Sequence, residues 1–407
     1  MKKTKKLLCV LLAASMLALC LSACGSSASS TETTAAAGET TAASGETAAA
    51  SGSKTLLLGG IGALTGDYAN YGTSVRNGAQ LAVDEINKAG GILGMQVSLD
   101  FQDSQADPDS AVNAYGKLMD SGMNVSLGAV FSGETTSVVA AAKEDDIMLL
   151  TPCASADKVI TGNDNAFRVC FKDSAQGTAS ADYIASNNMA TEVSVFYQSD
   201  IDYSVGLYNA FKTECEAKGI TIKEVQTFTD GTKTDFSTQI NAIKEAGTKL
   251  VFMPIYAAEA SVFLTQAAGK LDADTVFFGC DGLDGILTKV SDTSVVENVM
   301  MLTPFAADSK DENVQTFVAA YKTAYSATPD QFAADGYDAV YVIKAAMEKA
   351  NATDPTAADF TSSIVSAMTQ ITVKGVTGTM TWSADGETQK EAKAMIIHDG
   401  VAVLYEG

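Results

Sequence analysis

The feature that most constrains this 407-residue chain is a regular alternation of apolar and amphipathic segments that begins at Thr55. The apolar segment TLLLGGIGAL comes first, and a segment with Val75, Ala79 and Val83 on one helical face follows it. The same order repeats through MQVSLDFQD, VSLGAVF and IMLLTP, with segments of helical periodicity between them. Strands that alternate with helices predict an α/β fold with a parallel central sheet covered by helices on both faces.

A second set of alternating segments starts after Arg168. Because about 350 residues are too many for one parallel core, the sequence predicts two Rossmann-like lobes. The alternation stops near Val299, and three helical segments are expected at about 311–326, 330–350 and 356–370. A hairpin over AKAMIIHDGVAVLYEG, turned by Asp399-Gly400, is expected to end the chain. We therefore expect the last third of the chain to contribute to both lobes.

The N-terminus has the organisation of a secretory signal. Residues 1–23 begin with four lysines, continue with an apolar run to about Leu21 and end in small residues. The junction LSAC resembles a bacterial lipobox, which predicts cleavage before Cys24 and lipid attachment to that cysteine. Residues 24–54 follow as a tether, since residues 25–53 are only Gly, Ser, Thr, Ala and Glu and offer no large apolar side chain to stabilise an ordered backbone.

Charge restricts the partners. Removal of the signal takes four of the 27 basic residues and none of the 49 acidic ones, which leaves a net charge near −26. Nucleic acids and anionic lipid surfaces are therefore poor partners, and the lipid anchor is the only expected membrane contact. We expect a monomer that is exported and held at the outer face of the cell membrane, or at the periplasmic side in a cell with two membranes.

Histidine and cysteine restrict the chemistry. The one histidine, His398, adjoins an Asp-Gly turn, so catalytic triads, zinc sites and acid–base schemes that need histidine are not expected. Cys153, Cys170, Cys215 and Cys280 remain in the folded part at spacings that fit neither a CxxC pair nor a zinc site. The sequence leaves open whether they form disulfides or stay as buried thiols. We expect no metal, no cofactor and no enzymatic activity.

The glycines in LLLGGIGALTGDYANYG could suggest a nucleotide-binding turn. A dinucleotide loop needs G-x-G-x-x-G, but Thr65 stands at the third glycine, and the acids Asp100 and Asp103 lie too far downstream to hold a ribose. The P-loop spacing is absent as well. The loop after Gly62 instead carries polar and aromatic groups, including Tyr71, at the carboxyl end of a strand, where open α/β sheets bind ligands.

Other strand ends carry groups that suit a small ligand. A helix N-terminus at SGETT offers free N–H groups to an anion such as a carboxylate, and the other loops offer hydroxyls, aromatic rings and one acid. Taken singly, each has a structural alternative: a helix cap, a turn or an ordinary loop tyrosine. Together they match a zwitterion with an apolar tail. The candidates are Tyr71; Ser132, Gly133, Glu134 and Thr135; Cys153, Ala154 and Ser155; and Tyr203, Tyr256 and Asp281.

Several stretches in order resemble the branched-chain amino acid (Leu/Ile/Val) binding proteins of ABC importers, which are type I periplasmic binding proteins. They are GALTGDYANYGTSVRNGAQLAVDEINKAGGILGMQV, VFSGETTSVV, IMLLTPCASA, RVCFKDSAQG and PDQFAADGYDAVYVIKAA. The resemblance implies a clamshell of two lobes joined by three hinge crossovers, near 168–173, 302–305 and 379–383. Lobe 1 would contain residues 55–170 and 304–380, and lobe 2 residues 171–303 and 381–407.

The resemblance also implies roles for the candidates. The ligand carboxylate would be held by residues 132–135 and Ser155. The ammonium group would meet the Cys153 carbonyl, the Ser155 hydroxyl and the Asp281 carboxylate, with Tyr71, Tyr203 and Tyr256 as walls of the side-chain pocket. The sequence departs from the family at Glu134, where a serine often stands and where the acid must turn outward. It also has Gln105 and Phe131 at the places of the cysteines of the family's first-lobe disulfide.

We therefore predict a lipid-anchored receptor that captures an amino acid, with leucine, isoleucine or valine as the leading ligands, and delivers it to the permease subunits of an ABC importer. One alternative is a receptor on the same fold for another amino acid, an amide or an aromatic acid, including one with a sensory role. A second alternative is an exported hydrolase that uses Glu134 and Asp281 as a carboxylate pair.

Overall fold

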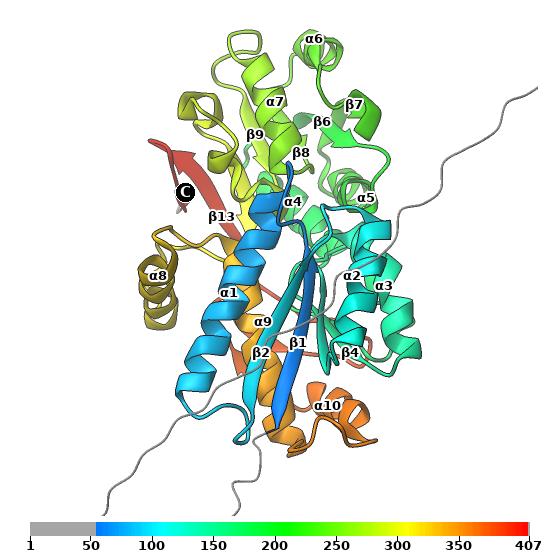
Figure 1. Cartoon of the computed structure of the whole chain (residues 1–407). Helices are drawn as coiled ribbons and strands as arrows, with labels where there is room; N and C mark the ends of the chain where they lie inside the picture. Colours follow the sequence, from blue (N-terminus) through cyan, green and yellow to red (C-terminus); the bar gives the residue numbers. More distant parts are fainter. Residues whose placement is uncertain (1–53, 406–407) are drawn as a thin grey trace, which may run out of the picture. The chain divides into compact units, whose positions relative to one another are not determined.

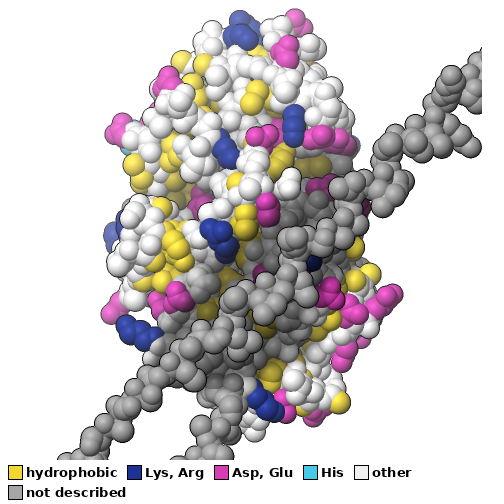
Figure 2. Space-filling view, viewed as in Figure 1, with side chains coloured by type: hydrophobic (Ala, Val, Ile, Leu, Met, Phe, Trp, Pro, Cys, Tyr) yellow, Lys and Arg dark blue, Asp and Glu magenta, His cyan; other side chains and the backbone are white. Residues whose placement is uncertain are grey.

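A computed structural model describes residues 54–405, and these form two α/β lobes (Figure 1). The expected signal peptide, the lipid site Cys24 and the tether up to residue 53 lie outside the described residues. Each lobe is built on one central sheet, as the alternating pattern predicts. On the face shown in Figure 2, acidic side chains are spread over the surface with basic ones among them.

Lobe 1 contains a five-stranded parallel sheet in the order β2-β1-β3-β4-β5. Its strands are β1 (Thr55–Gly62), β2 (Gln96–Asp103), β3 (Val125–Ala129), β4 (Met148–Thr151) and β5 (Ala166–Arg168). Its helices are α1 (Ala69–Lys88), α2 (Pro108–Asp120), α3 (Ser132–Glu144), α9 (Gln331–Ala350) and α10 (Phe360–Met368). Because β1 lies inside the sheet and is covered by helices, Leu56 and Leu58 are completely buried.

Helices α1 and α9 lie side by side in lobe 1 although they are far apart in the sequence (Figure 1). Glycine permits this contact. A Cβ atom on Gly78 would lie 1.8 Å from the Ala333 carbonyl oxygen, and one on Gly336 would lie 2.3 Å from that of Val75. The N-terminus of α9 is thereby held beside α1 at the edge that faces lobe 2.

Lobe 2 contains a seven-stranded sheet in the order β14-β13-β10-β9-β8-β6-β7. Its strands are β6 (Glu192–Gln198), β7 (Thr221–Phe228), β8 (Leu250–Met253), β9 (Val276–Gly279), β10 (Met300–Thr303), β13 (Lys393–His398) and β14 (Val401–Leu404). Its helices are α4 (Asp173–Ser186), α5 (Asp202–Lys218), α6 (Ser237–Ala246) and α7 (Ala257–Ala267). The sheet is parallel except for β13 and β14, which add the expected hairpin at one edge.

The chain passes between the sheets three times. It leaves β5 at Arg168 and starts α4 at Asp173, it leaves β10 at Thr303, and it returns to lobe 2 after Thr381. The last third of the chain serves both lobes through α8 (Glu312–Tyr325), α9, α10, the pair β11 (Thr372–Lys374) and β12 (Thr379–Thr381), and the final hairpin. This confirms the expected clamshell with three crossovers.

The four cysteines of the described part are free thiols and are buried. The sequence left open whether these cysteines form disulfides or stay as buried thiols, and the structure has buried thiols. Burial raises the pKa of the Cys153 and Cys280 thiols, which keeps them protonated.

Candidate functional site

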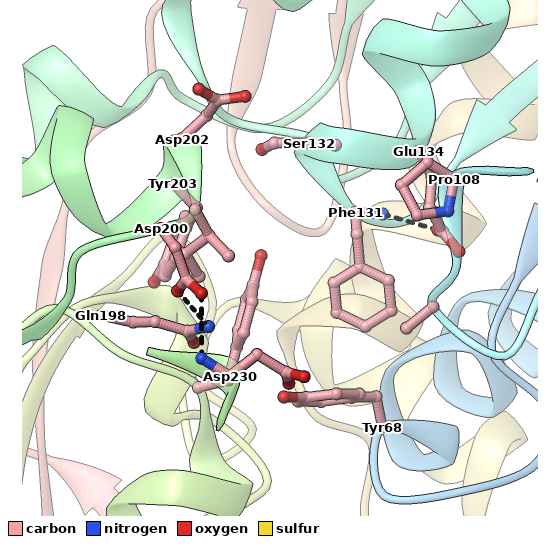
Figure 3. Close-up of a pocket in the computed structure, with 14 residues that line it drawn as sticks. Tyr68, Pro108, Phe131, Ser132, Glu134, Gln198, Asp200, Asp202, Tyr203 and Asp230 are labelled. Atoms are coloured by element: carbon pink, nitrogen blue, oxygen red, sulfur yellow. Dashed lines mark hydrogen bonds between the residues drawn. The ribbon is translucent and has the colours of Figure 1, made fainter. Parts of the chain in front are cut away.

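Two adjoining cavities between the lobes share Phe131, Tyr203 and Tyr256 in their walls. The outer cavity measures about 330 Å³, within the range of small-molecule sites (Figure 3). The inner cavity measures only about 10 Å³, roughly enough for one water molecule. Its lining residues are Tyr71, Val130, Phe131, Cys153, Ser155, Tyr203, Tyr256, Asp281, Gly282 and Phe332.

Helix α3 brings its N-terminus to the outer cavity from lobe 1. The first turn leaves the N–H groups of Ser132, Gly133 and Glu134 without intrahelical acceptors, and these three residues line the cavity. Thr135 does not face the cavity, because its hydroxyl donates to the Ala129 carbonyl oxygen at 2.8 Å and is buried in lobe 1. Its N–H also donates to the Phe131 carbonyl oxygen at 2.9 Å, so of the four residues 132–135 predicted to hold the carboxylate, Thr135 has both its donors engaged within lobe 1.

Glu134 also behaves differently from the expectation that its side chain turns outward. One carboxylate oxygen accepts a hydrogen bond from the Phe131 N–H at 3.3 Å, so the side chain folds back over the start of its own helix (Figure 3). The residue is only 1% exposed, and burial raises its pKa to about 7. The acid therefore caps α3 and leaves the helix N–H groups to face the cavity.

The loop after β4 is held by a buried arginine at the first crossover. The Arg168 guanidinium donates to the carbonyl oxygens of Ala154, Ser155 and Ala156 at 3.2, 2.6 and 3.1 Å, and it pairs with Glu387 at 3.1 Å. These bonds fix the loop that carries Cys153 and Ser155 into the inner cavity. Ala154, which the sequence also predicts at the site, is packed in the core of lobe 1 and lines neither cavity.

Lobe 2 supplies the acid. The Asp281 carboxylate accepts hydrogen bonds from the Tyr203 hydroxyl at 2.7 Å, the Gln176 amide at 2.9 Å and the Gly282 N–H at 2.8 Å. The residue is 4% exposed, and burial raises its pKa while the Tyr203 and Gln176 bonds lower it. A Cβ atom on Gly282 would lie 2.5 Å from the Tyr203 hydroxyl oxygen, so glycine is required beside this acid.

Aromatic rings fill the space between the lobes. Tyr203 stacks on Tyr256 with 4.7 Å between centroids, and Tyr71 contacts Phe131, Tyr256 and Phe332 edge to face. The Tyr71 hydroxyl joins the two lobes directly, because it donates to the Gly282 carbonyl oxygen at 2.7 Å and accepts from the Ala257 N–H at 2.8 Å. The lobes are therefore closed on one another in this structure.

The structure thus brings Tyr71, Cys153, Ser155, Tyr203, Tyr256 and Asp281 to the inner cavity, and Ser132, Gly133 and Glu134 to the outer one. Three further residues were missed by sequence reasoning. Gln176 orients Asp281, Phe332 lines the inner cavity, and Asp173, beside Ser155, is a completely buried acid whose pKa is raised by burial. Gln176 and Asp173 lie within RVCFKDSAQG, but nothing in that stretch indicates which helix face meets the site.

The charge of the cavities is one-sided. Their linings contain Glu134, Asp200, Asp202, Asp230 and Asp281 and no lysine, arginine or histidine. Two of the acids have cations nearby, since Asp202 pairs with Lys158 at 2.7 Å and Asp230 with Lys233 at 2.7 Å. Asp281 has no cation among its hydrogen-bond partners in the described chain. The inner cavity therefore suits a ligand that brings a positive group.

The described residues contain one cluster with the composition of a metal site: His398 and Asp399 at the turn of the final hairpin, with Glu297 from the segment before β10. Its members already bond to one another, with 2.7 Å between the His398 Nδ1 atom and Glu297. No helix between residues 54 and 405 is both long and apolar enough to span a membrane.

A closed pair of α/β lobes with an acid, N–H groups and aromatic rings between them defines a small-molecule binding protein. Residues 55–399 match the model of the family described as periplasmic binding protein, and the chain belongs to this family. The family is extracytoplasmic. The Leu/Ile/Val-binding protein homolog 3 of Brucella melitensis is 31% identical over 74% of this chain and 81% of its own length.

Solved structures agree with this assignment. The branched-chain amino acid transporter substrate-binding protein LivJ of Streptococcus pneumoniae, in complex with isoleucine, is 29% identical with a TM-score of 0.78 and covers 86% of this chain and 99% of its own. A solute-binding protein of an ABC transporter from R. palustris, in complex with benzoate, is 21% identical with a TM-score of 0.77 and covers 86% and 95%. At that identity, the benzoate-bound protein supports the fold alone.

Proposed function

We propose that the protein captures an amino acid between its lobes, with leucine, isoleucine or valine as the preferred ligands, and delivers it to the permease subunits of an ABC importer. The observation that carries the proposal is that Ser155 of lobe 1 and Asp281 of lobe 2 line the same cavity. The acid would accept the ammonium group. The α3 N-terminus, with Ser132 and Gly133, and the Ser155 hydroxyl would hold the carboxylate.

The aromatic wall supports an apolar side chain. Tyr71, Phe131, Tyr256 and Phe332 contact one another around the inner cavity, and rings of this kind bury aliphatic groups. The names of the relatives point to the same class of ligand: one is a Leu/Ile/Val-binding protein homolog, and one solved neighbour holds isoleucine.

Binding would require the lobes to open and close again. A cavity of about 10 Å³ cannot hold an amino acid, so the ligand must enter an open form and displace the contacts that Tyr71 makes with lobe 2. We propose that residues 55–170 with 304–380, and residues 171–303 with 381–407, move as the two bodies. A ligand that contacts both bodies would shift the population toward the closed form, which the permease would recognise.

An aromatic acid is a poorer candidate. A benzoate has a carboxylate but no ammonium group, and it would leave the buried Asp281 facing a ligand of like charge in a cavity lined by no basic side chain.

We also propose that the mature protein is a monomer anchored by lipid on Cys24. The four lysines, the apolar run and the LSAC junction support this proposal. Replacement of Cys24 by alanine should release the protein from the membrane fraction, and continued membrane association of that variant would contradict the anchor.

The test is a titration of the purified mature chain with amino acids and aromatic acids, followed by calorimetry and by thermal unfolding. A ligand that binds only the folded form must raise the melting temperature. We expect leucine, isoleucine or valine to stabilise the protein and benzoate to have no effect. Stabilisation by benzoate, with none by the amino acids, would reject the proposal.

A further inference from the structure

The loop that carries Asp281 makes a second contact across the lobes. Three residues further on, an Asp284 carboxylate oxygen of lobe 2 accepts a hydrogen bond from the Gln331 N–H at 2.8 Å, at the first residue of α9 in lobe 1. The other oxygen accepts from the Gly285 N–H at 2.9 Å. Asp284 therefore caps a helix of the opposite lobe, which is a contact that exists only while the lobes are closed.

A second carboxylate already occupies that helix end. Asp330 is the N-cap of α9 and accepts from the Ala333 N–H at 2.9 Å, and its other oxygen accepts from the Ser74 hydroxyl at 2.7 Å. Both acids line a cavity of about 340 Å³ whose walls are largely apolar, including Met301, Phe305 and Ile397. Closure thus brings two like charges to one helix N-terminus beside an apolar wall.

No cation compensates the pair. Within residues 54–405, neither Asp284 nor Asp330 forms an ion pair, and their partners are N–H groups and one hydroxyl. Asp335 is the other acid near them, and Lys390 already binds it at 3.1 Å. Tyr71 of α1, Cys153 of the β4 loop and Tyr321 of α8 also lie near the pair, and all three are neutral because burial raises the pKa of each. Hydrogen bonds at the helix N-terminus favour the charge of each acid singly, but the two like charges have no cation beside them, and a proton taken up by one acid would relieve their repulsion.

We propose that closure of the two lobes takes up a proton at the Asp284–Asp330 pair, so that acidification favours the closed form. At neutral pH, repulsion between the two acids would oppose closure of the empty protein. The contacts that a ligand makes with both lobes would overcome this repulsion.

The direction follows from the environment of the two acids. Both acids are half-buried at the closed interface. Burial, and next the charge of Asp330, raise the pKa of Asp284 to about 7 in the closed form, although the Gln331 and Gly285 N–H groups lower it. Burial also raises the pKa of Asp330, against the hydrogen bonds from Ser74 and the helix N–H groups, which lower it. In an open form exposed to water, an aspartate has a pKa of about 4. The closed form therefore binds an extra proton between about pH 4 and 7. The extra proton stabilises the closed form relative to the open form. This stabilisation is fully present below about pH 4 and is lost as the pH rises through about 7.

The test measures closure without ligand, so it does not depend on the identity of the amino acid. Spin labels would be placed on exposed positions of the two lobes, with Asn113→Cys in α2 and Lys212→Cys in α5, in the mature chain whose other described cysteines are buried. Electron resonance distances would give the ratio of closed to open protein at pH 5.5 and pH 8. The comparison is between the labelled wild type, Asp284→Asn and Asp330→Asn.

We expect the closed-to-open ratio of the wild type to rise about thirtyfold from pH 8 to pH 5.5. Asparagine keeps an acceptor for the helix N–H but carries no charge, so Asp284→Asn should be more closed than the wild type at pH 8 and should change less than threefold. Asp330→Asn, which retains the cap, should also lose most of the response. Asp292→Asn, an exposed acid in lobe 2, is the matched control and should behave as the wild type.

An equal pH response in the wild type and Asp284→Asn would overturn the proposal, as would a wild type that does not respond. Asp281 and Asp173 are buried acids that can also take up protons. The test of the proposal is therefore the difference in pH response between the wild type and Asp284→Asn. The statement that a bound ligand completes closure at neutral pH rests on the proposed function. If no amino acid binds at either pH, the proposed function fails, while the closure measurement still tests the proton uptake.

Discussion

The two walls of the interlobe cavities differ in chemistry. Lobe 1 presents the N-terminus of α3 and a serine on a loop that Arg168 fixes, and these groups favour negative charge. Lobe 2 presents the Asp281 carboxylate within a network of Tyr203 and Gln176, which favours positive charge. A zwitterion matches both walls together, and either wall alone would bind only half of it. The difference teaches why a two-lobed protein can use closure as the signal that its ligand is bound.

The largest effect is expected from removal of the lobe 2 acid. Asp281→Ala leaves the ligand ammonium buried without a partner, and loss of one member of a buried charge pair costs about 2–5 kcal/mol. We expect affinity for the amino acid, measured by calorimetry, to fall by roughly a hundredfold or more. Asp292→Ala removes an exposed acid of the same lobe and should bind normally. Full affinity in Asp281→Ala would remove the chemical difference between the walls.

A smaller loss is expected on the other wall. Ser155→Ala removes one hydroxyl that would donate to the charged carboxylate, and such bonds contribute about 1.5 kcal/mol or more, equivalent to roughly tenfold in affinity. Ser137→Ala, on the exposed face of α3, is the control. If Ser155→Ala binds as tightly as the wild type, the backbone N–H groups of α3 hold the carboxylate without this loop.

Tyr203→Phe should shift the pH dependence. The substitution removes a donor from the Asp281 carboxylate while the ring can still stack on Tyr256, so the pKa of Asp281, already raised by burial, should rise further. Because the ammonium group binds the ionised acid, affinity falls as the pH drops through this pKa. The variant should therefore lose affinity at a higher pH than the wild type. Identical pH profiles from calorimetry would show that the hydroxyl does not support the acid.

The smallest effect is expected at Glu134. Its side chain caps α3 through the Phe131 N–H and is almost fully buried in the wall of the outer cavity, so Glu134→Gln should change affinity less than about twofold near neutral pH. A tenfold gain in affinity for the amino acid would instead mean that this carboxylate repels the ligand from lobe 1 and weakens the contrast between the walls.

Much of the fold follows from local patterns. The alternation after Thr55 predicts both α/β lobes, and the Asp399-Gly400 turn predicts the final hairpin, because each depends on residues close in the chain. The site was predicted less completely. Residues at strand ends could be found from the carboxyl edge of a parallel sheet, but Thr135 and Ala154 face the core, Gln176 binds Asp281 and Phe332 lines the inner cavity. A strand end specifies a position along the sheet edge and not the direction of each side chain.

The sequence by itself determined the class of fold, the loops that meet at the interlobe edge and the acid that opposes them, because strand periodicity and turn residues act over short distances. Only the tertiary structure decided that Asp284 reaches the end of α9, that Tyr71 joins the lobes and that Glu134 folds back on its own helix. Asp284 and Tyr71 form their contacts between segments far apart in the chain. Their distances, and the burial that shifts the pKa of each acid, exist only once the two lobes have packed together.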